Sequence, residues 1–163
     1  MKPIHLLVSY IMMTQSALLG VRFTVVLYAA SHYSPAVVGM VLSLYSVPPL
    51  LGAVHMGRWT DRVGSRLPMI CTCSAMIVAA LLMAAVQDLW LICLAALLWG
   101  GGGFGQHVVC NTLAGRCGPP EERAANFVTL TTGIAAANAS APYVLGLLID
   151  HLGNYPLIFG LLG

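Results

Sequence analysis

The sequence predicts an all-α protein that crosses a membrane several times. Of its 163 residues 59% are apolar and 7% are charged, whereas an ordinary globular domain has about 25% charged residues. Seven basic and five acidic residues are too few to cover the surface of a soluble domain of this length. The mean hydropathy is +0.88, and the apolar residues form long runs separated by short polar stretches. Each such run is expected to be one membrane-spanning helix.

Five apolar runs provide the roughly 20 residues that a bilayer requires. They are residues 4–30, 36–56, 67–86, 89–113 and 124–149. The first run could also be a secretory signal peptide, because Lys2 precedes it and residues 29–31 resemble a cleavage site. We favour a span, because the run exceeds the usual apolar region of about 7–15 residues and contains Arg22. Pro48 and Pro49 are expected to bend the second helix.

The connections between the runs are short. Residues 114–123, with several Gly and Pro residues, are expected to join the fourth and fifth helices, and residues 150–155 to form a turn. A sixth apolar run begins at Pro156 and holds eight residues, which rise only about 12 Å against a hydrocarbon core of about 30 Å. We expect this run to be the start of a sixth span whose remainder lies outside the chain.

Basic residues are confined to alternate connections. Those at the amino terminus and in the second-to-third and fourth-to-fifth connections are Lys2, Arg58, Arg62, Arg66, Arg116 and Arg123. The other connections contain no Lys or Arg and carry Asp88 and Asp150. The positive-inside rule therefore predicts that the amino terminus lies in the cytoplasm.

The strongly charged stretch, residues 57–66, lies between the second and third runs. It resembles the signature loop of the major facilitator superfamily, a large family of secondary transporters. The family form is Gly, three residues, Asp-Arg, one residue, Gly-Arg, then Arg or Lys. The matching residues are Gly57, Asp61, Arg62, Gly64 and Arg66. Ser65 replaces the first basic residue of the final pair.

The resemblance implies the amino-terminal portion of a multi-pass transporter in the cell membrane. Such a protein moves a small solute by alternating access, with its site between two six-helix halves, so the carboxyl-terminal half and the lipid bilayer are the expected partners. No cofactor, metal or nucleic acid is expected. In the family the loop is thought to latch the cytoplasmic side, and Asp61 would meet the positive end of a helix from the other half. The alternative is that the charges of the loop only anchor topology.

A faint repeat supports the same family. Gly57, Asp61 and Gly64 have the same spacing as Gly146, Asp150 and Gly153, at an offset of 89 residues. Inverted repeats of three helices would produce this pattern. Chance agreement at two turns would produce it as well.

Arg22 is the one basic residue in the interior of a predicted span. Placing it in hydrocarbon would cost at least about 3 kcal/mol, so we expect it to face a solute cavity or to snorkel to the outer interface. Gln15 lies seven residues earlier and shares nearly the same helical face. Both residues are candidates for the solute pathway.

The fourth helix carries further candidates, Gln106, His107 and Asn111. His107 could bind solute or carry a proton, or could be a hydrogen-bonded packing residue. The glycines at 100–103 and 105 are expected to serve close helix packing. Many family members have an arginine in this helix that is linked to proton-driven transport. The corresponding position is near Ala96, so proton coupling through that residue is in doubt.

The fifth helix resembles the antiporter motif of the family only in part. Its Pro142 and Gly146 fit the core Gly-Pro, two residues, Gly-Gly, but Ala141 and Leu145 replace two glycines. This resemblance favours efflux over uptake, and a generic small-residue packing face explains it equally well. Asn138 is a solute-pathway candidate, while nearby threonines could face a cavity or bond their own helix.

Two other classes of function remain as alternatives. A non-transporting membrane subunit or sensor would share these features. An intramembrane enzyme would need a zinc motif, paired aspartates or a serine nucleophile with its histidine base, and none of these patterns occurs within the predicted spans. The five cysteines show no metal-ligand spacing and are interpreted as small apolar residues.

Overall fold

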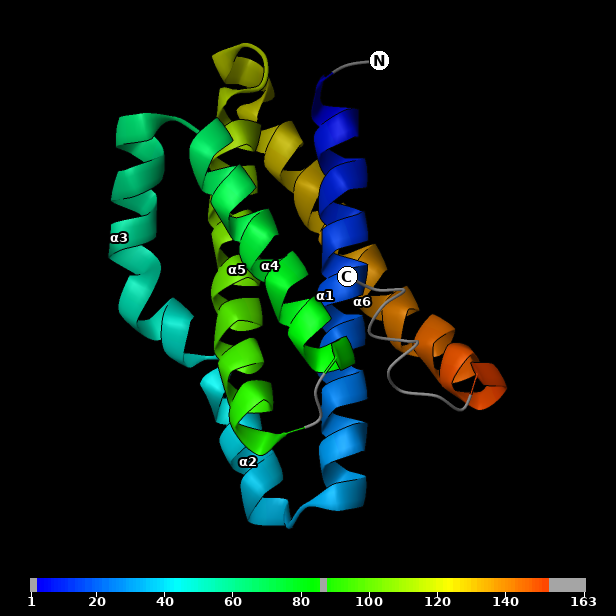
Figure 1. The fold of residues 1–163 in the computed structure, drawn as a ribbon. Helices are drawn as coiled ribbons and strands as arrows, with labels where there is room; N and C mark the ends of the chain where they lie inside the picture. Colours follow the sequence, from blue (N-terminus) through cyan, green and yellow to red (C-terminus); the bar gives the residue numbers. More distant parts are fainter. Residues whose placement is uncertain (1–2, 86–87, 153–163) are drawn as a thin grey trace.

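The computed structural model describes residues 3–85 and 88–152, in which every regular element is a helix (Figure 1). The elements are α1 (Pro3–His32), α2 (Pro35–Leu44), α3 (Val47–Val63), α4 (Arg66–Ala85), α5 (Leu89–Arg116), a 3-10 helix (Pro120–Glu122) and α6 (Arg123–Leu152). The prediction of an all-α protein is therefore confirmed.

Four stretches of the described residues are long and apolar enough to cross a membrane. They are Ile4–His32, Pro35–Val63, Arg66–Ala84 and Leu89–Arg116. The helix α6 is 30 residues long and carries Thr, Asn and Ser residues. Its place as a fifth span stays a prediction, and the predicted start of a sixth span lies outside the described residues.

The second predicted helix is broken rather than bent. The helix α2 ends at Leu44, and α3 begins at Val47 after a turn in which the Ser46 N–H donates to the Ser43 carbonyl at 3.0 Å. Pro48 and Pro49 cause the break, because neither has an N–H to donate four residues back and their rings crowd the carbonyls there. The break thus falls just before the prolines.

The charged stretch is mostly helical, contrary to the prediction of a ten-residue loop. Residues 57–63 continue α3, and Arg66 is the first residue of α4, so only Gly64 and Ser65 form the connection. Gly64 has a φ of +86°, a conformation that favours glycine, and its N–H donates to the Thr60 carbonyl at 3.1 Å. A helix can extend past the hydrocarbon because its own backbone bonds remain satisfied in the polar interface.

Two other predicted connections begin later in the chain than expected. The helix α5 continues to Arg116, so residues 114–116 of the predicted connector are helical. The Asn126 side chain donates to the Cys117 carbonyl and ties the connector to α6. Residues 150–152 are helical rather than part of a turn, and the rest of that predicted turn lies outside the described residues.

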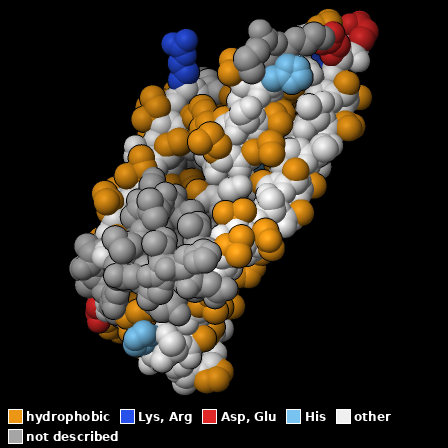
Figure 2. Space-filling model, turned by 90° about the vertical axis from the view of Figure 1, so that its right-hand side faces the viewer, with side chains coloured by type: hydrophobic (Ala, Val, Ile, Leu, Met, Phe, Trp, Pro, Cys, Tyr) orange, Lys and Arg blue, Asp and Glu red, His pale blue; other side chains and the backbone are white. Residues whose placement is uncertain are grey.

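The helices are arranged so that alternate connections meet at one end. Figure 1 shows the start of α1, the α3–α4 connection and the α5–α6 connection together at the top, with the α1–α2 turn at the opposite end. In Figure 2 apolar side chains spread along the flank of the molecule, whereas the charged groups of that face lie towards its ends. This distribution is the one expected of a bundle surrounded by lipid.

The helix α5 is the centre of the bundle and packs against α1, α2, α3, α4 and α6. Its glycines allow this crowding. A Cβ atom added to Gly100 would lie 2.3 Å from the Tyr45 carbonyl oxygen of α2, and one added to Gly103 would lie 1.8 Å from Leu18 of α1. Small residues let helices approach closely in membranes, which is the role that the sequence predicts for this run.

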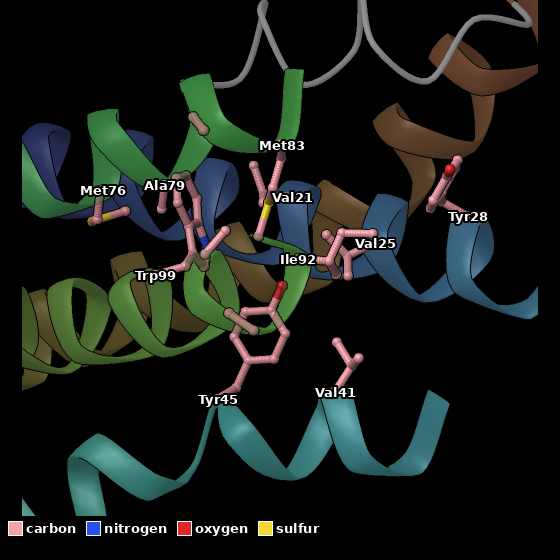
Figure 3. Close-up of a cluster of buried hydrophobic side chains, with 13 residues drawn as sticks. Val21, Val25, Tyr28, Val41, Tyr45, Met76, Ala79, Met83, Ile92 and Trp99 are labelled. Atoms are coloured by element: carbon pink, nitrogen blue, oxygen red, sulfur yellow. The ribbon is translucent and has the colours of Figure 1, made fainter. Parts of the chain in front are cut away.

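The main apolar core lies where α1, α2, α4 and α5 meet (Figure 3). Trp99 of α5 is 1% exposed, and its indole N–H donates to the Leu18 carbonyl at 3.2 Å. Tyr45 points from α2 into the same cluster beside Val21 and Ile92. This core holds the end of α2 at the break against α1 and α5.

We expect Gly100→Ala to destabilise the bundle, because the new methyl group would collide with backbone rather than with a side chain that can rotate. The cost should be about 1–3 kcal/mol, measured as a lower midpoint of thermal unfolding in detergent. Gly39→Ala is the matched control, since nothing lies within 4 Å of a Cβ at that helical position. Equal stability of the two variants would contradict the close α2–α5 contact.

Candidate functional site

Three polar side chains from three helices form one hydrogen-bonded chain that runs from buried Gln15 to exposed Asn138. The Gln15 side chain of α1 donates from Nε2 to Oδ1 of Asn138 on α6 at 2.8 Å. Its Oε1 pairs with Nε2 of His107 on α5 at 2.7 Å, so the imidazole donates there. Gln15 is buried and His107 is half-buried. The structure thus brings together three residues that the sequence placed on separate predicted spans.

His107 also lines a groove of about 280 Å³ between α1, the α2–α3 break and α5. We call it the Arg22 groove. Its lining consists of Leu18, Arg22, Tyr45, Ser46, Pro49, Trp99, Gly100, Gly103, Phe104 and His107. Arg22 and the Gln15–His107–Asn138 chain are therefore parts of one continuous region.

The guanidinium of Arg22 lies over the ring of Tyr45, with its Cζ atom 5.7 Å from the ring centroid. This is a cation–π distance. Arg22 stands ten residues before His32, the last residue of α1, which is about 15 Å along the helix axis. Arg22 is exposed in the described bundle and lines the Arg22 groove, so its role in a solute cavity stays a prediction.

Gln106 lies in a different environment from His107. Its Nε2 donates to Oγ1 of Thr72 at 2.8 Å and to Sγ of Cys73 at 2.8 Å, and its Oε1 accepts from the Tyr10 hydroxyl at 2.5 Å. Gln106 is 1% exposed, so these contacts join α1, α4 and α5 in the interior. A structural role explains this buried amide, and nothing places it on the Arg22 groove.

The remaining polar candidates bond to their own helices. The Asn111 side chain is exposed and donates to the His107 carbonyl at 2.9 Å. Thr129 and Thr132 donate to backbone carbonyls four residues earlier in α6, at 2.7 and 2.8 Å. The local hydrogen-bonding interpretation of these threonines is therefore the observed one.

The residues of the signature stretch lie away from the groove. Asp61 accepts a contact from Nη2 of Arg116, at the end of α5, at 3.5 Å, and the two side chains are 68% and 55% exposed. Exposed pairs of this kind are worth about 0–1 kcal/mol. Nothing lies within 4 Å of a Cβ at Gly57 among the described residues, so this face of α3 is open.

Several residues of the site were not predicted from the sequence. Tyr45 and Trp99 line the groove, while Tyr10 and Cys73 hold Gln106. The prolines after Tyr45 were a usable signal, because they predict an interruption that exposes side chains near the middle of a span. No signal singles out Cys73 beyond its residue type.

The region offers no obvious ligands for a metal. Within the described residues no group of three or more His, Cys, Asp or Glu side chains could hold an ion. Ala96, where many family members have an arginine, is fully buried in the apolar core. A long charged side chain would not fit there without repacking.

The sequence comparisons agree with these features. The model of the Major Facilitator Superfamily matches residues 6–163. The chain is 30% identical over 122 residues to the multidrug resistance protein MdtG of Salmonella paratyphi A, Salmonella arizonae and Salmonella newport. Each match covers 74% of this chain and 30% of the relative, so the chain spans about a third of the length of those proteins. The chain belongs to the major facilitator superfamily.

Proposed function

We propose that the chain forms the amino-terminal bundle of a secondary transporter that moves a small solute across the cell membrane by alternating access. The observation that carries this proposal is the continuous polar region formed by Gln15, Arg22, His107 and Asn138. Polar residues inside spans are costly and mark solute pathways when they face a cavity. Here they come from three helices, α1, α5 and α6.

The other wall of the solute site would come from the rest of the transporter. The matched relatives are much longer than the segment that they share with this chain. In transporters built from repeats, the substrate lies between halves near the bilayer midplane. The Arg22 groove and the open face of α3 would both face that second half.

Efflux is the proposed direction of transport. The relatives are named multidrug resistance proteins. The partial resemblance of Pro142 and Gly146 to the antiporter motif of the family also favours efflux, and Pro142 lies within the helix α6. His107 is the candidate proton carrier, because an imidazole can gain and lose a proton and its Nε2 already pairs with Oε1 of Gln15.

We expect the amino terminus and the Gly64–Ser65 connection to face the cytoplasm. In a cysteine-free full-length protein, Ser65→Cys and Gly118→Cys should react with an impermeant maleimide only in inside-out vesicles, and Asp88→Cys only in intact cells. The reason is the six-to-none distribution of basic residues between the two ends. Labelling of Ser65→Cys and Asp88→Cys from the same side would contradict this topology.

Counterflow in proteoliposomes tests transport itself. Proteoliposomes that contain the full-length protein would be loaded with an unlabelled solute identified in an efflux screen. Entry of the radiolabelled solute into them would then be followed. A carrier gives a transient accumulation above equilibrium. A membrane subunit or sensor gives no accumulation with any solute that it binds.

A further inference from the structure

We propose that the Arg22 groove binds the negatively charged group of an organic anion, whose apolar or aromatic body lies along the rest of the groove. The inference rests on the proposed function, because it names the class of solute that the site would accept. Three features of the groove support it: a cation that has no carboxylate partner among the described residues, a broken helix, and aromatic walls.

The first feature is the charge of Arg22. The described part of the chain offers this guanidinium no carboxylate within salt-bridge distance. The described acidic side chains, Asp61, Asp88, Glu121 and Glu122, lie at helix ends or in connections. A cation inside a span is stabilised by an opposite charge, and an anionic solute would supply it. The Tyr45 ring supplies only part of that stabilisation.

The second feature is the break between α2 and α3. Tyr45 and Ser46 of the break line the groove together with Pro49. The start of α3 is the positive end of its helix dipole, and the Ser46 hydroxyl makes no capping bond to α3. In transporters, the amino termini of broken helices point at anionic groups of the substrate. The break therefore places the Ser46 hydroxyl and the first turn of α3 on the lining of the groove.

The third feature is the apolar remainder of the groove. Trp99 and Phe104 of α5 and Leu18 of α1 line it, and the Trp99 indole N–H is already used by the Leu18 carbonyl. These walls favour a hydrophobic or aromatic body over a sugar-like one, because few hydrogen-bond donors or acceptors remain for hydroxyl groups. Small-molecule sites usually combine such walls with a few placed polar groups. An amphipathic organic anion fits both parts.

The test compares probes that share a ring and differ in charge. Binding of phenylphosphonate, benzoate, benzamide and benzamidine to purified full-length protein would be measured by calorimetry in phosphatidylcholine nanodiscs. The two anions should bind and benzamidine should not. Arg22→Gln should weaken anion binding about 10- to 100-fold, because it removes a charge-assisted hydrogen bond, and Arg22→Lys should weaken it less. Arg123→Gln, which removes an arginine outside the groove, should leave binding unchanged.

Two results would overturn the proposal: preference for benzamidine or benzamide over the anions, and anion binding that Arg22→Gln leaves unchanged. Nanodiscs containing phosphatidylglycerol separate a soluble anion from a lipid headgroup. If phosphatidylglycerol occupies the groove, and no soluble probe binds in nanodiscs that lack this lipid, the solute assignment is wrong. Arg22-dependent anion binding without counterflow would instead contradict only the transport function. Counterflow of neutral or cationic solutes alone would contradict only the anion assignment.

Discussion

Arg22→Ala is expected to abolish transport, with a decrease of about 100-fold in initial rate, while the protein is still expressed and inserted. The size of this decrease follows from the loss of one charge-assisted interaction, about 1.5–3 kcal/mol, in a groove whose other lining residues include no Lys or Arg. Insertion should not suffer, because replacing a charged residue with alanine makes α1 more apolar. The measurements are efflux from cells and the amount of protein in the membrane fraction.

Two further variants separate the pathway role of Arg22 from snorkelling. Lysine snorkels as well as arginine, so Arg22→Lys should transport normally if the side chain only reaches the interface. In the groove, lysine lacks the planar guanidinium that lies over Tyr45, and we expect only partial transport. Arg123→Ala controls for the loss of one basic residue at a helix end. Normal transport by Arg22→Ala would make snorkelling the correct interpretation.

Asp61→Asn is expected to slow transport about 5- to 30-fold and to bias the carrier toward the inward-open state. We propose that the Asp61 carboxylate, which is 68% exposed in this bundle, meets the amino-terminal end of a helix from the other half. Such a contact is worth about 1–2 kcal/mol when it is partly buried, and asparagine removes its charge at nearly constant shape. Transport rates and state-dependent cysteine labelling of the full-length protein would measure both effects.

The contact between Asp61 and Arg116 provides the control for this latch hypothesis. If Asp61 acts only through Arg116, then Arg116→Gln should have the same effect as Asp61→Asn, and the double variant should add nothing. If Asp61 acts on the other half, Arg116→Gln should have a much smaller effect, because an exposed pair contributes little. Wild-type rates and labelling for Asp61→Asn would leave the charges of this stretch with a topological role alone.

The sequence by itself determined the fold class, the four confirmed membrane-length stretches and the distribution of basic residues. These properties depend on composition and on the length of apolar runs, which the bilayer selects directly. The motif at residues 57–66 also indicated the superfamily that the comparisons show. It did not show that most of the motif is helical, because a polar helix and a polar loop have similar compositions at a membrane surface.

Only the tertiary structure decided how the polar residues are grouped. Gln106 and His107 are neighbours in sequence, yet one is buried with Tyr10 and the other lines the Arg22 groove. Adjacent residues of a helix point about 100° apart, so their environments depend on which helices pack on each side. The same reason explains Tyr45. Its ring lies under the Arg22 guanidinium because the helix breaks just before Pro48 and because Gly100 lets the Tyr45 backbone approach α5 closely.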